Sequence, residues 1–150
     1  MSLKDKLTED MKQAMRDKEA GKFRLSVIRM VRASIKNLEI DRKRDLTEEE
    51  VVEVLAKEVK MRRDAMEEFK KGNRPDLVDN LEQEIVILMQ YLPQQMDEPE
   101  VRSLVAEAVS QTNAAGPKDM GKVMAVLMPK VRGRADGKLV NAIVREMLNK

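Results

Sequence analysis

The stretch Gly116-Pro117-Lys118-Asp119-Met120-Gly121-Lys122-Val123 has the G-x-x-x-x-G-K spacing of a phosphate-binding loop. Such a loop follows a buried strand, presents glycine-rich backbone N–H groups to the phosphates, and uses a Ser or Thr hydroxyl to hold Mg²⁺. Here Val123 occupies the hydroxyl position, and the preceding VRSLVAEAVSQT has the pattern of a helix. We therefore interpret the match as a coincidence of spacing and expect no bound nucleotide. Gly116 then ends one helix, Pro117 begins the next, and Gly121 is expected where helices approach closely.

Catalytic chemistry is poorly supported by the residue types present. The chain contains no cysteine and no histidine, which removes the thiolate nucleophile and the commonest general base and metal ligand. Carboxylate clusters such as Glu48-Glu49-Glu50 occur, but on charged helices they are usually solvated or cap a helix. The serines and threonines have no histidine to activate them. We expect no catalytic site, no metal site and no cofactor.

A second kind of candidate site is a cluster of cations near the carboxy terminus. Pro129, Gly133 and Gly137 predict a tight connection between two helices, from which positive side chains project. The free N–H groups of the helix that begins there are expected to add attraction for an anion. A merely solvated turn is the alternative. The candidate nucleic-acid-binding residues are Lys122, Lys130, Arg132, Arg134 and Lys138.

Aromatic residues make up only 2% of the chain, which limits what a basic surface can recognise. Stacking on single-stranded bases normally uses Phe, Tyr or Trp, and none accompanies the cluster. Recognition of phosphates and of the shape of a folded RNA therefore fits better than base-specific reading.

Another basic stripe, Arg29, Arg32 and Lys36, falls at helical spacing earlier in the chain. The segment from Asp45 to Glu58 is strongly acidic. We favour the interpretation that the stripe is a solvent-exposed face partnered with this acidic segment, and binding of an anionic partner is the alternative.

Length and composition indicate a helical protein of one domain or two small ones. The chain has 150 residues, 37% of them charged, a formal net charge of +2 and 12 methionines that can fill a core of packed helices. The longest purely apolar run, residues 85–89, is too short to cross a bilayer. The first residues lack the apolar core of a secretory signal and carry acids that argue against a transit peptide. We expect a cytoplasmic protein without a membrane partner.

Apolar spacing and capping signals predict helices throughout. Ser2 with Asp5 and Thr47 with Glu50 have capping-box spacing. The predicted helices run from Ser2 to Gly21, around 25–38, from Thr47 to Gly72, from Pro75 to Leu92, after Asp97, from about Pro117 to Met128, and after Asp136. The predicted fold is all-α, with a four-helix bundle-like subdomain at 1–92, a connector at 93–99 and a three-helix subdomain at 100–150 that carries the basic loop.

Three motifs resemble a known family. They are Tyr91-Leu92-Pro93-x-Gln95, Asp119-Met120-Gly121-Lys122-Val123-Met124 and Gly133-Arg134-Ala135-Asp136-Gly137-Lys138-Leu139-Val140. Together with Arg24-Leu25-Ser26-Val27-Ile28-Arg29, they closely resemble the YqeY family over essentially the whole chain. That family is similar to the tail of the B subunit of the glutamyl/aspartyl-tRNA amidotransferase. This tail tends to have Ala-Asn-Pro where the present chain has Ala135-Asp136-Gly137.

The resemblance implies two all-α subdomains and a contact with tRNA. In the amidotransferase the tail contacts the tRNA elbow, and amide transfer takes place in a separate catalytic cradle. Family members are therefore associated with carbon–nitrogen ligase activity that uses glutamine as amido donor. The present chain has no such cradle, so we expect an accessory tRNA-binding module without its own catalytic site. A helical adaptor that docks on an amidotransferase, a synthetase or another translation-related enzyme is the alternative, and an independent amidase or ligase is the third hypothesis.

Overall fold

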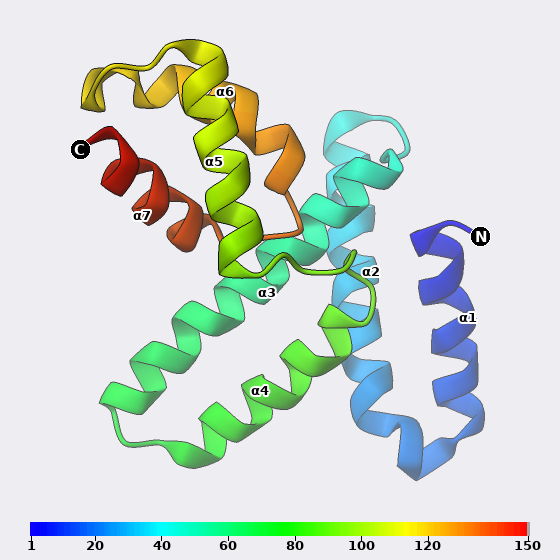
Figure 1. Cartoon of the computed structure of the whole chain (residues 1–150). Coiled ribbons are helices and arrows are strands. Elements are labelled where there is room, and N and C mark those ends of the chain that lie inside the picture. The colour runs from blue at the N-terminus through cyan, green and yellow to red at the C-terminus, as the bar shows by residue number, and fades with distance from the viewer. Residues whose placement is uncertain (150) are drawn as a thin grey trace. The chain divides into compact units, whose positions relative to one another are not determined.

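The chain forms seven α-helices in its computed structural model, which describes residues 1–149 (Figure 1). No strand occurs in that range, so the all-α prediction is confirmed. Two short 3₁₀ turns, at Lys18–Gly21 and Pro117–Asp119, precede α2 and α6. The helices are α1 (Leu3–Arg16), α2 (Lys22–Arg42), α3 (Glu48–Lys71), α4 (Pro75–Met89), α5 (Glu98–Thr112), α6 (Met120–Val131) and α7 (Gly137–Leu148).

Four predicted helix starts are confirmed by cap hydrogen bonds, whereas the sixth helix begins at Met120 after a 3₁₀ turn and not at Pro117. The Ser2 hydroxyl accepts from the Asp5 N–H, and the Thr47 hydroxyl accepts from the Glu50 N–H; both form reciprocal capping boxes. The carboxylates of Asp97 and Asp136 cap α5 and α7. Each cap satisfies a backbone donor that the first helical turn leaves without a partner, which is why these starts can be read from spacing alone.

The predicted ends of the first, fourth and sixth helices are wrong, and the fourth ends at Met89 instead of Leu92. The first helix stops at Arg16 instead of continuing to Gly21, because Lys18 has a left-handed φ of 52° and a 3₁₀ turn follows. The sixth helix continues past Pro129 to Val131. A proline removes one intrahelical donor, but here it lies so near the carboxyl end that the remaining bonds complete the last turn.

The helices divide into two compact units, Met1–Leu92 and a second that begins at Pro93. The first contains α1 to α4, and α3 and α4 form a helical hairpin (Figure 1). Its core is built from aliphatic residues of all four helices together with Tyr91. The second contains α5 to α7 around Val105, Leu127 and Val144, each 0% exposed. No helix in the described range is both long and apolar enough to span a membrane.

The first unit depends on a very close backbone contact at Gly21. Gly21 is buried, and a Cβ atom added there would overlap the backbone carbonyl of Ala14. Gly21 has a φ of −98°, which any residue can adopt. The requirement for glycine is therefore one of space, where the chain turns back from α1 into α2.

A polar cluster joins α1, α2 and the residues after α4. The Tyr91 hydroxyl donates to the Asp10 carboxylate over 2.5 Å. The Arg24 guanidinium lies 3.3 Å from the same carboxylate oxygen, and the Lys6 ammonium lies 5.3 Å from the centroid of the Tyr91 ring. Burial, followed by the hydrogen bond to Asp10, raises the pKa of Tyr91 to about 12. The cluster therefore anchors the only tyrosine of the chain in its protonated form.

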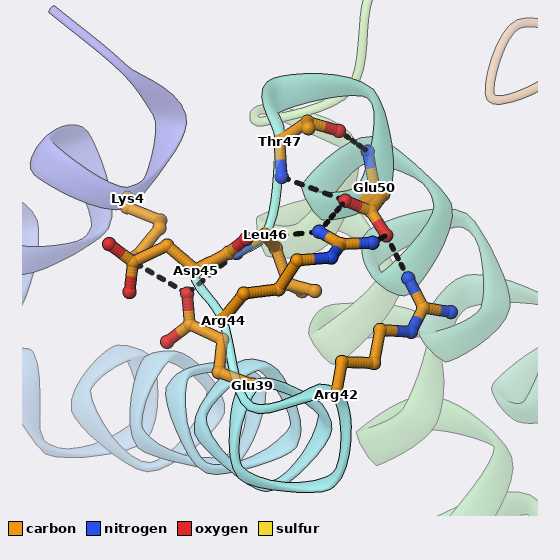
Figure 2. A network of polar contacts seen from close by, with 8 residues as sticks. All are labelled: Lys4, Glu39, Arg42, Arg44, Asp45, Leu46, Thr47 and Glu50. Carbon is orange, nitrogen blue, oxygen red and sulfur yellow. Dashed lines mark hydrogen bonds and ion pairs between the residues drawn. The ribbon is translucent and has the colours of Figure 1, made fainter.

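Ion pairs between α2 and the start of α3 explain part of the charge segregation. Glu50 accepts hydrogen bonds from Arg42, from Arg44 and from the Thr47 N–H (Figure 2). The acidic segment thus neutralises the end of α2. It does not partner Arg29, Arg32 and Lys36, which form no ion pair with any residue of the described chain and lie beside α1 instead. Arg29 and Lys36 are solvent-exposed as expected, but the expected pairing with the acidic segment is wrong, because periodicity places residues on one face without showing which helix lies opposite.

We expect Gly21→Ala to destabilise the protein by about 2 kcal/mol or more, since a backbone carbonyl cannot move aside as a side chain can. Gly121→Ala is the matched control, because a Cβ at Gly121 would meet no atom within 4 Å. Alanine there should leave stability unchanged or raise it by up to about 1 kcal/mol. Urea unfolding followed by circular dichroism measures both, and equal stabilities of the two variants would contradict the close contact.

We expect Tyr91→Phe to lower stability at neutral pH by about 1 kcal/mol, because the Asp10 carboxylate loses one of its two donors and keeps only Arg24. The raised pKa also predicts a pH dependence. The folded chain holds the phenolic proton more tightly than the unfolded chain, so this contribution is complete below about pH 10 and is lost as the pH rises towards 12. The stability difference between wild type and Tyr91→Phe should therefore shrink over that range. Parallel curves of unfolding free energy against pH for wild type and Tyr91→Phe would contradict the raised pKa of Tyr91.

Candidate nucleic-acid interface

The connection between α6 and α7 is a compact turn centred on Gly133. The Val131 carbonyl accepts from both the Arg134 N–H, at 2.9 Å, and the Ala135 N–H, at 3.0 Å. Gly133 has a φ of 76°, in the left-handed region that glycine adopts without a steric penalty. The turn therefore ends α6 abruptly and places Arg132 and Arg134 on a short, well-defined piece of backbone.

Residues 93–96 lie against this turn and hold it in place. The Gln95 side-chain amide donates to the carbonyls of Gly133, at 2.8 Å, and Pro93, at 2.9 Å. The Met96 N–H donates to the Arg134 carbonyl over 2.7 Å. In return, Nε of Arg134 donates to the Gln94 carbonyl over 3.3 Å. From the sequence, Gln95 could be recognised only as part of a family motif. Its structural role depends on the contact with Gly133, which lies 38 residues further along the chain.

The predicted cations all lie on α6, on the turn, or on the first residues of α7. Lys122 and Lys130 are exposed. The Lys122 ammonium lies 3.9 Å from a carboxylate oxygen of Asp119, and the Lys130 ammonium lies 3.9 Å from one of Glu107. Arg132 and Lys138 are also exposed, and Arg134 is half-buried by its bond to Gln94. The arrangement groups Arg132, Arg134 and Lys138 around one turn, while Lys122 lies two helical turns before Lys130.

Acidic side chains at the same surface reduce its positive charge. Asp136 accepts from the Lys138 N–H over 3.1 Å, so the chain's own carboxylate occupies the start of α7. This corrects the expectation that free N–H groups there attract an external anion. Asp119 accepts from the Ala115 N–H over 2.9 Å, and this bond, with the nearby Lys122 and Lys118, holds its pKa below the usual range. Lys118 is also exposed and adds a cation that was not among the predicted nucleic-acid-binding residues.

The segment with phosphate-loop spacing has a different structural context from a nucleotide site. It follows α5 and a turn, and Pro117–Asp119 form a 3₁₀ turn rather than an open loop. Gly121 is exposed and has no neighbour within 4 Å of a Cβ position, so the expected close helix approach at Gly121 is wrong. A close backbone approach at a glycine occurs instead at Gly21, which packs against the Ala14 carbonyl. Within residues 1–149, no group of three or more acidic, histidine or cysteine side chains is placed to hold a metal ion.

Comparisons with known proteins identify the family. Residues 4–148 match the family described as Yqey-like protein. The chain is similar to "Altered inheritance of mitochondria protein 41, mitochondrial" of Lachancea thermotolerans, at 34% identity over 96% of this chain and 80% of that protein. The protein of the same name from Pyrenophora tritici-repentis is 30% identical over 95% of this chain and 79% of its own length.

A shorter match supports the similarity to an amidotransferase. It is to the E subunit of the glutamyl-tRNA(Gln) amidotransferase of Thermococcus gammatolerans, at 42% identity over 57 residues, which are 35% of this chain and 9% of that protein. This relative is the E subunit of its enzyme, whereas the motifs suggested the tail of the B subunit. The chain therefore belongs to the Yqey-like family, and its similarity to this amidotransferase protein is confined to a short segment.

We expect Gln95→Ala to loosen the turn at Gly133 and to lower stability by about 1 to 2 kcal/mol, since it leaves the Gly133 carbonyl without its donor. Gln94→Ala is the matched control, because Arg134 bonds to the backbone carbonyl of Gln94 and not to its side chain. Amide hydrogen exchange at residues 132–136 should accelerate in Gln95→Ala alone. Equal exchange in the two variants would show that the Gln95 amide does not hold the turn.

Proposed function

We propose that this member of the Yqey-like family is an accessory tRNA-binding module, and that the turn at residues 132–136 is its contact with the tRNA backbone. The observation that carries the proposal is the combination of exposed cations with a turn whose backbone is fixed by residues 94–96. A fixed turn presents its charges without a large loss of conformational entropy on binding.

The chemistry of the surface favours phosphate contacts. Arg132 and Arg134 project guanidinium groups, which bind phosphate through two parallel hydrogen bonds, and Lys130 and Lys138 add point charges. The aromatic residues, Phe23, Phe69 and Tyr91, all lie in the first unit. The second unit therefore has no ring on which a base could stack, and recognition of a folded RNA by its backbone fits these residues.

The similarity to a tRNA-dependent amidotransferase supports tRNA as the particular RNA. We assign no amide-forming step to this chain, because its sequence offers neither a thiol nor an imidazole, and nothing in it singles out a lysine as the base for a serine or threonine nucleophile. The association with glutamine-dependent carbon–nitrogen ligase activity then reflects a role beside an enzyme that carries the catalytic site. tRNA is present both in the cytoplasm, our expected location for this chain, and in mitochondria, for which the fungal relatives are named.

The charge-reversal variant Arg132→Glu/Arg134→Glu should lose tRNA binding while its helical circular dichroism stays the same. The wild type should bind tRNA at low ionic strength, and its affinity should fall steeply with salt because phosphate contacts release counterions. Fluorescence anisotropy of labelled tRNA measures both effects. The single variant Arg132→Glu keeps the Arg134–Gln94 bond and separates loss of charge from loss of the turn.

Lys60→Glu/Arg63→Glu is the matched control, since it changes net charge equally at exposed positions of α3 in the other unit. It should bind tRNA as the wild type does. The proposal fails if the wild type shows no salt-sensitive tRNA binding, or if the two double variants lose affinity equally.

A further inference from the structure

A groove of about 480 Å³ lies between α1 and α2 in the first unit. Its volume falls within the range of roughly 300–1,000 Å³ that is typical of ligand sites. Leu7 and Ile35 lie at its floor but are only 1% and 3% exposed, so the accessible apolar surface in the lining comes from the exposed methyl group of Ala33. The groove thus offers apolar surface together with the basic stripe of α2.

The groove carries more positive than negative charge, although Lys36 lies close enough to the Glu39 carboxylate to interact with it electrostatically. Arg29 and Lys36 are exposed and form no ion pair with residues 1–149. Arg32 donates from Nη1 to the sulfur of Met11 over 2.9 Å, a neutral partner that leaves the guanidinium charge in place. These three residues follow one another at i, i+3 and i+7, so their charges are spread over about 10 Å of the helix.

The one carboxylate that lines the groove is already occupied. Glu39 accepts from the Lys4 ammonium at 2.6 Å and from the Leu46 N–H at 2.9 Å (Figure 2). These contacts hold the pKa of Glu39 below its usual range. Glu39 therefore remains charged but is neutralised by Lys4, and the groove keeps the three charges of the α2 stripe.

We propose that this groove is a docking site for an acidic amphipathic helix of a partner protein. Acidic residues at i, i+3 and i+7 of such a helix would match the spacing of the α2 stripe. Its apolar side would contact Ala33 and, three residues earlier on α2, Met30, which is 43% exposed. Charge complementarity supplies selectivity, and Ala33 and Met30 supply apolar contact.

An RNA fits these residues less well. Phosphates would engage the three cations, but the apolar floor would face a charged backbone, and no aromatic side chain lines the groove to stack with a base. The docking site lies in the first unit and uses none of the residues proposed to contact tRNA. The two activities are therefore separable by substitution.

The test uses the full chain and a synthetic fluorescent peptide of about four helical turns. The peptide carries Glu along one side of its helix and Leu along the adjacent side; a scrambled peptide has the same composition. The wild type should bind the amphipathic peptide and bind the scrambled peptide at least tenfold more weakly. Arg29→Glu/Lys36→Glu should weaken binding of the amphipathic peptide by about tenfold or more, because attraction becomes repulsion at two positions.

Two further variants separate shape from charge. Ala33→Phe fills the groove without changing charge and should also weaken peptide binding. Lys60→Glu/Arg63→Glu changes net charge on α3 outside the groove and should not. Arg132→Glu/Arg134→Glu should bind the peptide normally. Failure of the tRNA proposal would therefore not contradict the docking site between α1 and α2. Equal binding of both peptides, no binding of either, or displacement of the peptide by single-stranded RNA or tRNA would overturn it.

Discussion

The carbonyl of Gly133 needs a hydrogen-bond donor, and the Gln95 side chain supplies it. A turn with a left-handed glycine leaves backbone groups that helices α6 and α7 cannot satisfy, so a donor from elsewhere has to fix it. Met96 and Arg134 complete the exchange of bonds between residues 94–96 and the turn. The orientation of the candidate cations therefore depends on a segment that carries no charge itself.

A second residue of the same short motif has a comparable structural role in the first unit. Tyr91 connects to Asp10 and Arg24, which lie on α1 and α2. Tyr91 and Gln95, two residues of the Tyr91-Leu92-Pro93-x-Gln95 motif, thus stabilise the fold. A family resemblance carried by such residues is strong support for the fold. It is weaker support for the RNA contact, which depends on the cations.

Helix starts and the fold class could be predicted because they depend on neighbours in sequence. Ser2, Thr47, Asp97 and Asp136 each bond within three residues, so spacing alone reveals them. The close glycine contact was assigned to Gly121 and occurs at Gly21, because local sequence does not show what lies opposite a backbone atom. The Gln95 amide and the pairing of the α2 stripe were missed for the same reason. The five candidate cations could be identified by type, but the contact of Lys130 with Glu107, much earlier in the chain, could be assessed only from the structure.

The two basic surfaces differ in how their charge is balanced, and this difference argues for different partners. Among the candidate cations of the second unit, Asp119 and Glu107 lie beside Lys122 and Lys130 on α6, and Asp136 lies beside Lys138 at the turn, so attraction to a phosphate chain requires several contacts at once. A long polyanion such as a folded RNA can supply them, whereas a short acidic segment cannot. In the α1–α2 groove the stripe forms no ion pair with the described residues, and Glu39 is the carboxylate that offsets part of its charge. A partner must bring both negative charge and apolar surface to such a site, and an acidic amphipathic helix provides the two on one face.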